Sequence, residues 1–191
     1  MTDERVADPG TVEIPADVEA VVYDLDGTLV RLVVDWAELD TEIQAVLREE
    51  GLDPGDRDAW DLLDVAEAAG VSGVESMIAA AERDGAHAST RLPLADSIDH
   101  GLPTGVCSLN CEAACRIALD AHDLAQHVDT VVGRDSVAER KPAPEPLLTA
   151  IEGLDADPAR TLFVGDSASD ETTADRAGTR FSYVGDGPTT L

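Results

Sequence analysis

Basic side chains are scarce in this chain of 191 residues, which has 13 Lys and Arg against 40 Asp and Glu. Its formal net charge is therefore -27 at pH 7. So large a negative charge repels the phosphate backbone of nucleic acids and anionic membrane surfaces, and we expect neither as a partner. Lysine is the rarest basic residue: Lys141 is the only one, and all the others are Arg.

The chain also lacks long apolar runs and paired cysteines. No run of roughly 18 apolar residues exists, and the N-terminal segment has no apolar signal-peptide core, so we expect neither a membrane span nor secretion by that route. Cys107, Cys111 and Cys115 are spaced by four, which predicts buried thiols on one helical face. Three cysteines at this spacing fit neither a disulfide framework nor a zinc site, and we expect a reducing cytoplasm.

The strong acidity is not accompanied by the composition of a disordered chain. Hydrophobic residues make up 43% of the sequence, and short apolar segments such as residues 162–164 favour a packed core. A carboxylate-rich surface stays hydrated in molar salt, where ions screen charge repulsion over about 3 Å. The composition resembles that of haloarchaeal proteins.

Three regions can be distinguished along the chain. Residues 1–17 are polar and acidic, which predicts a flexible leader. Between residues 31 and 94 apolar residues recur at helical spacing, which predicts a small helical cap domain. Residues 18–30 and 95–191 are expected to form one core domain around that insertion.

The core domain alternates strand and helix signals, which predicts an α/β fold with a Rossmann-like, doubly wound parallel sheet. Ligands of such sheets bind at the carboxyl ends of the strands. We expect strands at 20–23, 106–109, 128–132, 161–164 and 181–184, and helices at 111–122, 144–152 and 170–177.

Pairs of aspartates follow two of these strands. Asp24 and Asp26 end the first strand, and Asp166 and Asp170 lie in the segment GDSASD after the fourth. Two carboxylates at the end of a buried strand are costly unless a divalent cation or a shared proton compensates them, although such residues also form turns and helix caps. Adjacent parallel strands would bring Asp166 close to Asp24. Oxygen ligands of this kind suit Mg²⁺ rather than zinc.

Ser108 and Lys141 are candidates for binding an anion. Ser108 ends an apolar strand, and Asn110 is expected to cap the following helix. A hydroxyl group and free N–H groups at that place make an anion site, although a serine before a helix is more often only a cap. Lys141 precedes a helix that begins among prolines, and its retention in a lysine-poor chain favours a role in neutralising bound phosphate.

Together these segments resemble the four motifs of the haloacid dehalogenase superfamily, in the order of that family. They are DLDGT at residues 24–28, Ser108, Lys141 and GDSASD at residues 165–170. The resemblance covers about residues 18–184. The insertion after the first motif resembles the helical cap of the phosphoglycolate phosphatase-like branch.

The resemblance implies roles for four aspartates. Asp24 would be the nucleophile that forms an aspartyl-phosphate, and Asp26 the general acid and base. Asp24, the main-chain carbonyl of Asp26, and Asp166 would hold Mg²⁺, with Asp170 supporting the metal.

The same resemblance implies that Thr28, Ser108 and Lys141 bind the phosphoryl group, with Lys141 also orienting the nucleophile. Leu109 separates Ser108 from Asn110, whereas many members have Ser or Thr followed directly by Asn. This departure leaves the role of Asn110 open.

The implied activity is phosphatase action on a small phosphorylated metabolite, either phosphoglycolate-like or a sugar phosphate. Dehalogenases of the family lack the second aspartate, which is present here, and phosphonatases need a cap lysine, which residues 31–94 do not contain. A phosphomutase and a catalytically silent binding or regulatory domain remain alternatives, and the protein could be a monomer or a homodimer.

The cap contributes candidate substrate contacts. Arg31, Arg83 and Arg91 could bind a substrate carboxylate or hydroxyl, although each position is more typical of a surface residue. The helical spacing of Trp36 and Trp60 favours a place in the core of the cap over a ligand contact.

Overall fold

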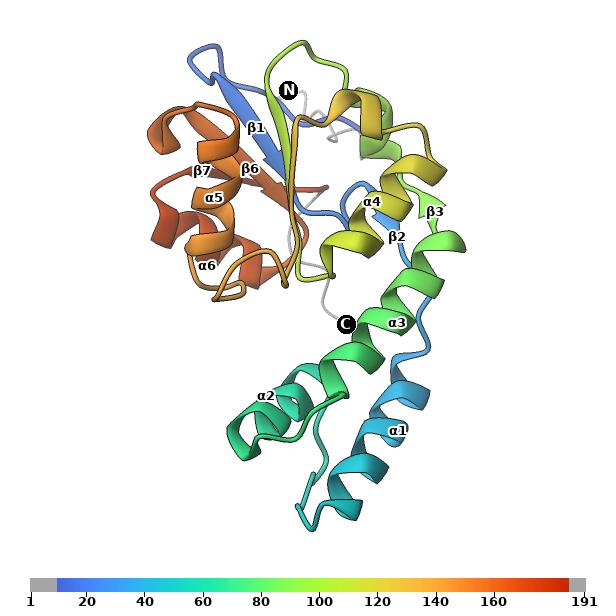
Figure 1. Ribbon diagram of the computed structural model, residues 1–191. Coiled ribbons are helices and arrows are strands. Elements are labelled where there is room, and N and C mark those ends of the chain that lie inside the picture. Colours follow the sequence, from blue (N-terminus) through green and yellow to red (C-terminus); the bar gives the residue numbers. More distant parts are fainter. Residues whose placement is uncertain (1–9, 186–191) are drawn as a thin grey trace, which may run out of the picture.

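The computed structural model describes residues 10–185, and its centre is a five-stranded parallel sheet in the order β5-β4-β1-β6-β7 (Figure 1). The α/β, doubly wound fold predicted from the sequence is confirmed. The chain crosses from β1 to β4 on one side and later to β6 on the other, so β1 lies at the switch point of the sheet, where ligands bind. The strands are β1 (Ala20–Tyr23), β4 (Thr104–Cys107), β5 (Thr130–Val132), β6 (Thr161–Gly165) and β7 (Arg180–Tyr183).

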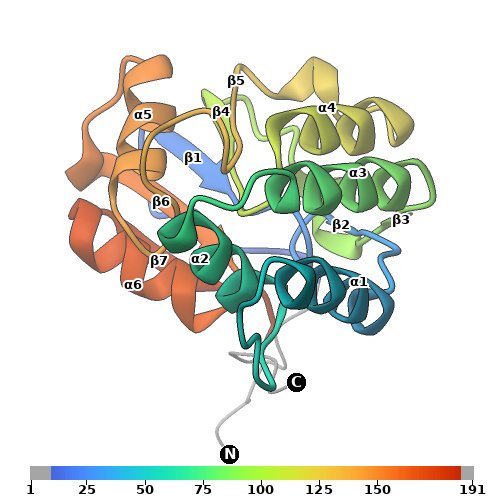
Figure 2. The same cartoon turned by 60° about the horizontal axis from the view of Figure 1, so that its bottom comes forward.

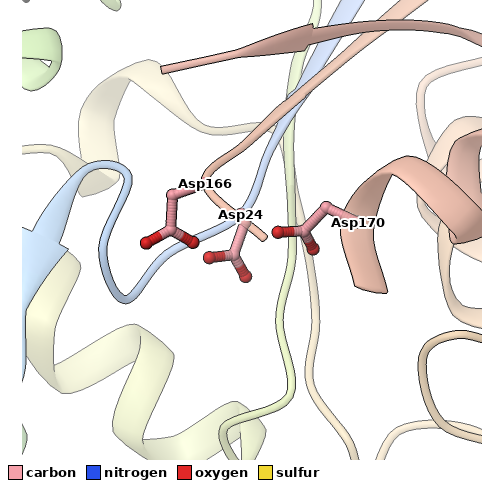
Figure 3. Close-up of side chains that lie close together, drawn as sticks. All are labelled: Asp24, Asp166 and Asp170. Atoms are coloured by element: carbon pink, nitrogen blue, oxygen red, sulfur yellow. The ribbon is translucent and has the colours of Figure 1, made fainter. Parts of the chain in front are cut away.

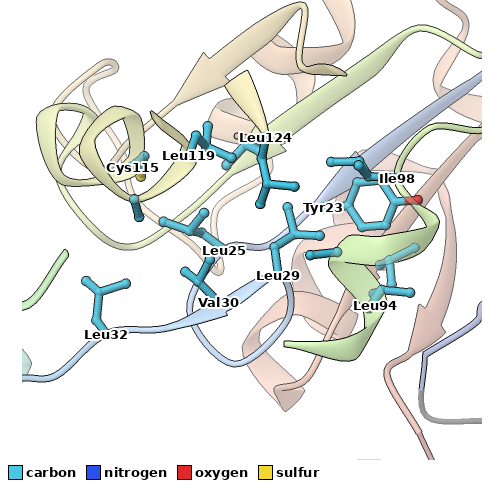
Figure 4. Close-up of a cluster of buried hydrophobic side chains, with 14 of the residues drawn as sticks. Tyr23, Leu25, Leu29, Val30, Leu32, Leu94, Ile98, Cys115, Leu119 and Leu124 are labelled. Atoms are coloured by element: carbon cyan, nitrogen blue, oxygen red, sulfur yellow. The ribbon is translucent and has the colours of Figure 1, made fainter. Parts of the chain in front are cut away.

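Helices cover both faces of the sheet. On one face lie α5 (Glu145–Gly153) and α6 (Ala168–Ala177), and on the other lies α4 (Glu112–Ala121) (Figure 1). Residues of β1 alternate between the two faces, as a strand requires. Ala20 and Val22 pack with α5 and α6, whereas Val21 and Tyr23 belong to the cluster on the α4 side. Figure 4 shows that cluster, in which Tyr23 lies among buried leucines.

Three helices form the insertion: α1 (Trp36–Glu49), α2 (Ala59–Ala69) and α3 (Val74–His87). They extend away from the sheet in Figure 1 and come forward in Figure 2, where α3 lies beside α4. Their apolar faces share a separate core, which includes Leu39, Ile43, Leu47, Leu62, Leu63 and Ile78. A short antiparallel ribbon of β2 (Val30–Arg31) and β3 (Thr90–Arg91) joins them to the sheet domain. The remaining elements are short 3₁₀ helices, η1 (Pro93–Ser97), η2 (Ala125–His127) and η3 (Pro158–Arg160).

Residues 10–17, part of the segment expected to be a flexible leader, contact the core domain. Val12 and Ile14 are partly buried against the main core, because burial of their apolar side chains is favourable. Ser97 Oγ donates a hydrogen bond to the Gly10 carbonyl at 2.6 Å, and Arg180 forms an ion pair with Asp17. Residues 1–9 of the expected leader lie outside the described residues.

The second strand of the core ends two residues earlier than expected. Thr104 pairs with Val21 of β1, and Ser108 lies just beyond the strand, with its N–H donating to the Val132 carbonyl at 3.0 Å. The N-cap of α4 is Cys111 rather than Asn110, because the Asn110 side chain is committed to other partners.

All three cysteines are free and buried, as predicted. They do not share one helical face, however. Cys107 lies in β4 and packs toward α5, whereas Cys111 and Cys115 pack in the cluster of α4. Of the helices between residues 10 and 185, none combines the length and apolar character needed to cross a bilayer.

Candidate active site

The candidate site lies at the carboxyl ends of β1, β4 and β6. Asp24 follows β1, and its N–H donates to the Val164 carbonyl of β6 at 2.8 Å. Ser108 follows β4, and Asp166 follows β6. Because β1 lies between β4 and β6, the ends of all three strands meet at one point. The structure therefore brings Asp166 beside Asp24, as the sequence predicted.

Three carboxyl groups converge there. Asp24, Asp166 and Asp170 each offer an oxygen atom within 4.8 Å of the others, and Figure 3 shows their side chains pointing toward one another. Asp170 is fixed at the start of α6 by Ser167, whose Oγ donates to Asp170 Oδ2 at 2.6 Å. The side chain of Asp26 is not part of this group: its Oδ1 accepts a hydrogen bond from the Leu32 N–H at 2.9 Å.

Lys141 is buried in the same place. Its Nζ donates to Asp24 Oδ1 at 2.8 Å, to Asp170 Oδ1 at 2.6 Å and to the Cys107 carbonyl at 3.1 Å. The residue is only 5% exposed, so these partners replace water around the ammonium group. The only lysine of the chain is thus placed in the acidic site rather than on the surface.

Burial and mutual repulsion shift the pKa values of the acidic residues of the site. Burial raises the pKa of Asp24 to about 7, Lys141 opposes the shift, and the charges of Asp170 and Asp166 add to it. Burial likewise raises the pKa of Asp26 and of Asp166. Burial alone would lower the pKa of Lys141, but Asp24 and Asp170 raise it above its usual value. The site therefore holds a charged ammonium and an excess of negative charge that a cation would relieve.

Gly27 allows the loop after β1 to pass directly beside Asp166. Its φ is +94°, and a Cβ at this position would lie 2.0 Å from Asp166 Oδ2. No other residue type combines this backbone conformation with so close an approach. The glycine of the DLDGT segment is therefore required by the geometry of the acid cluster.

Two of the residues expected to bind phosphate reach the site, and one does not. Ser108 and Lys141 both line the cavity above the acids. Thr28 is fully buried, its hydroxyl has no hydrogen-bond partner among the described residues, and it is not among the residues that line the cavity. The turn at Gly27 directs the Thr28 side chain into the protein, so the structure does not bring it together with Ser108 and Lys141.

The site opens into a cavity of about 440 Å³, of which the cap forms one wall. Trp36 and Trp60, whose rings lie 5.8 Å apart, pack on the core of the cap as expected and also line the cavity. Arg31 lines it too, whereas Arg91 bonds to Asp96. The lining residues are Asp24, Asp26, Arg31, Trp36, Trp60, Ser108, Leu109, Asn110, Lys141, Asp166, Ser167 and Asp170.

Sequence reasoning missed a buried ion pair next to the cavity, between Glu82 of α3 and Arg134 after β5. Glu82 lies four residues after Ile78 and eight after Val74, so it falls on the buried face of α3. A carboxylate on an apolar helical face is a signal that could have marked it.

Comparison with known proteins identifies the family of this chain. Residues 94–184 match the haloacid dehalogenase-like hydrolase family. The phosphoglycolate phosphatase of Rhodospirillum rubrum is 31% identical over 188 aligned positions, which cover 84% of this chain and 76% of that protein. The plasmid-encoded phosphoglycolate phosphatase of Cupriavidus necator is also 31% identical, over 93% of this chain and 86% of that protein.

A solved structure shows the same fold. The HAD (haloacid dehalogenase) phosphatase of Thermococcus onnurineus superposes with a TM-score of 0.58 at 21% identity, and the match covers 87% of this chain and 86% of that one. The parallel sheet and the sequence relatives lead to the same assignment. The chain belongs to the haloacid dehalogenase-like hydrolases, and it is a phosphatase.

Proposed function

We propose that this phosphatase is Mg²⁺-dependent and hydrolyses a small phosphorylated metabolite through a covalent aspartyl-phosphate on Asp24. The observation that carries the proposal is the double hydrogen bond of Lys141 to Asp24 and Asp170, with Asp166 completing the acid cluster. Lys141 holds Oδ1 of Asp24, which leaves the second oxygen to attack a phosphorus atom placed in the cavity.

The reaction has two halves. In the first, Asp24 attacks phosphorus, and the bond from phosphorus to the ester oxygen of the substrate breaks while Asp26 gives that oxygen a proton. In the second, Asp26 takes a proton from water, the water oxygen attacks the phosphorus of the aspartyl-phosphate, and inorganic phosphate and free Asp24 are released. Asp26 lines the cavity, and burial raises its pKa, which suits a carboxyl group that must carry a proton.

The donor set fits Mg²⁺. Three carboxylates converge on one point, oxygen is their only donor type, and their mutual repulsion contributes to the raised pKa of Asp24. Asp24, the main-chain carbonyl of Asp26, and Asp166 would hold the ion, with Asp170 in support. When bound, Mg²⁺ would neutralise negative charge on the phosphoryl oxygens.

Ser108 and Lys141 would hold the phosphoryl group in the cavity. The Ser108 hydroxyl, which donates to Asn110 Oδ1 in the structure, would turn its single proton to one phosphoryl oxygen, and the Lys141 ammonium can offset the charge of another. Both side chains are nearly fully buried, so water competes weakly for these hydrogen bonds.

The leaving group would contact the cap. Arg31 offers a guanidinium group to a carboxylate, which favours a phosphoglycolate-like acid as the first substrate to test, in keeping with the names of the sequence relatives. The indole faces of Trp36 and Trp60 could instead receive a sugar ring, which makes sugar phosphates the second class.

The test is phosphate release from p-nitrophenyl phosphate, phosphoglycolate and a panel of sugar phosphates, with Mg²⁺ or with EDTA, in low and high salt. We expect Mg²⁺-dependent release that Asp24→Asn abolishes and that Asp99→Asn leaves unchanged, because Asp99 is an exposed acid outside the cavity. Phosphoryl movement within a substrate without net phosphate release would favour a phosphomutase. Absence of both reactions in the folded protein would refute the proposed substrate classes.

A further inference from the structure

A buried ion pair that the proposed reaction does not use connects the cap to the core. Glu82 of α3 is fully buried, and Arg134, just after β5, is 6% exposed. Arg134 Nη1 donates to Glu82 Oε1 at 2.8 Å, and Nη2 donates to Oε2 at 3.2 Å. Burying such a pair contributes little net stability, since desolvation offsets the attraction, so its presence here calls for another role.

Glu82 also contacts the loop that carries Ser108. Its Oε1 accepts from Asn110 Nδ2 at 3.3 Å, and its Oε2 accepts from the Cys111 N–H at 2.9 Å. The side chain of Cys111, the N-cap of α4, makes no capping hydrogen bond. Glu82 binds the N–H of this N-cap residue, and Asp135 Oδ1 accepts from the next N–H, that of Glu112, at 2.7 Å. A negative charge is favourable at a helix N-terminus. Here Glu82, from helix α3 of the cap domain, supplies such a charge.

Asn110, which is held by Glu82, is in turn hydrogen-bonded to Ser108. Ser108 Oγ donates to Asn110 Oδ1 at 3.1 Å and accepts from the Asn110 N–H at 3.2 Å. A chain of hydrogen bonds thus leads from Glu82 through Asn110 to the hydroxyl at the cavity. When the Ser108 proton turns to a phosphoryl oxygen, Oγ still accepts from the Asn110 N–H, so Asn110 continues to fix its position.

Arg134 also contacts both the cap helices and the loop that carries Ser108. Its Nη2 donates to Glu75 Oε1 of α3 at 2.7 Å, and its guanidinium lies 5.1 Å from the ring centre of Trp60 on α2. It also donates to the carbonyl of Leu109, next to Ser108. One side chain of the core therefore touches two helices of the cap and the loop that carries Ser108.

We propose that Glu82, with Arg134 as its counter-ion, is a positioning residue that orients Ser108 through Asn110 and sets the cap wall relative to the phosphoryl site. The inference rests on the proposed function, because it assumes that Ser108 binds the phosphoryl group. It assigns Asn110 a role as the link between Glu82 and Ser108.

The test compares Glu82→Gln, Asn110→Ala and the double variant with the wild type in the full-length protein. The readouts are the dissociation constant of inorganic phosphate by calorimetry in the presence of Mg²⁺, kcat and KM for p-nitrophenyl phosphate, and the half-saturating Mg²⁺ concentration. Asp64→Asn is the matched control, since Asp64 makes a second ion pair between cap and core, with Arg140, but its side chain is 64% exposed.

Each single variant is expected to weaken phosphate binding about tenfold and to lower kcat/KM by about 10- to 100-fold, as loss of a hydrogen bond to a charged group and misplacement of a reacting group predict. The double variant is expected to lose no more phosphate affinity than the more severely affected single variant, because both changes break the same chain of hydrogen bonds. Half-saturating Mg²⁺ stays unchanged, which a general loosening of the fold would not allow, and Asp64→Asn stays within about twofold of wild type.

Additive losses in the double variant, or unchanged phosphate affinity in either single variant, would overturn the inference. If Glu82→Gln does not fold, Asn110→Ala alone decides, because it removes the link while it leaves the ion pair in place. A wild-type protein that shows no Mg²⁺-dependent phosphate release refutes the proposed function instead, and calorimetry still tests phosphate binding in the variants.

Discussion

Replacing Lys141 by Met should be among the most destabilising single changes in this protein. Methionine keeps an unbranched side chain, but it removes the ammonium group, which bonds to Asp24 and Asp170 and lies 5.5 Å from the centre of the Phe163 ring. Removal of one partner of a buried ion pair costs about 3–5 kcal/mol. Since two carboxylates lose their partner here, we expect the upper part of that range, which is a large share of the roughly 5–15 kcal/mol that stabilises a domain.

Urea unfolding of the metal-free protein in EDTA, followed by circular dichroism, measures this loss as a fall in the free energy of unfolding. Arg140→Met is the matched control, because Arg140 is the neighbour in sequence and its ion pairs with Asp64 and Glu67 lie at the surface. We expect that control to cost no more than about 1 kcal/mol.

Salt separates the two variants further. Roughly molar salt screens charges over about 3 Å, so the small penalty of Arg140→Met should vanish while that of Lys141→Met persists. If Lys141→Met lies within about 1 kcal/mol of the wild type, the idea that the ammonium group holds the acid cluster together is refuted.

Three further predictions concern the same site. Mg²⁺ at about 100 times its dissociation constant should stabilise the wild type by about 2.7 kcal/mol in the same assay. Asp166→Asn should remove most of this stabilisation. If the stabilisation by Mg²⁺ is unchanged in Asp166→Asn, the ion binds elsewhere. Gly27→Ala should lower kcat/KM at least tenfold, because its Cβ would displace Asp166. Gly70 has a similar positive φ but open space around it, so Gly70→Ala should lose only about 1 kcal/mol of stability. Equal activity of the two variants would contradict this prediction. Asp26→Asn should lower kcat by about 10² to 10⁴-fold while Mg²⁺ still stabilises the protein, and a lost Mg²⁺ effect would show that the side chain holds the ion rather than the proton.

The sheet and its acids could be predicted because local sequence encodes them. The strand at residues 20–23 is apolar throughout and ends at Asp24, and the parallel arrangement of strands then determines where Asp166 must lie. The boundaries near Ser108 were less accurate, since the last residues of β4 depend on pairing with β1 and β5 rather than on their own pattern.

Tertiary contacts decided the residues around the acids. The helical spacing of Trp36 and Trp60 predicted core residues of the cap domain, but the orientation of that domain also places them in the wall of the cavity. Thr28 belongs to the same short segment as Asp24, yet the turn at Gly27 buries its hydroxyl. Helical spacing reports which face of a helix is apolar, not what that face meets.

The sequence by itself determined the fold class, the order of the four motif segments and the convergence of Asp24, Asp166 and Lys141. Alternating strands and helices leave few topologies and one end of the sheet for the polar residues. Only the tertiary structure showed that Glu82 meets Arg134 and Asn110. These residues come from three segments, separated by 28 and 52 positions from Glu82, and their contact depends on how the cap packs against the core. No local pattern encodes that packing, because it is set by the joint burial of surfaces that are far apart in the chain.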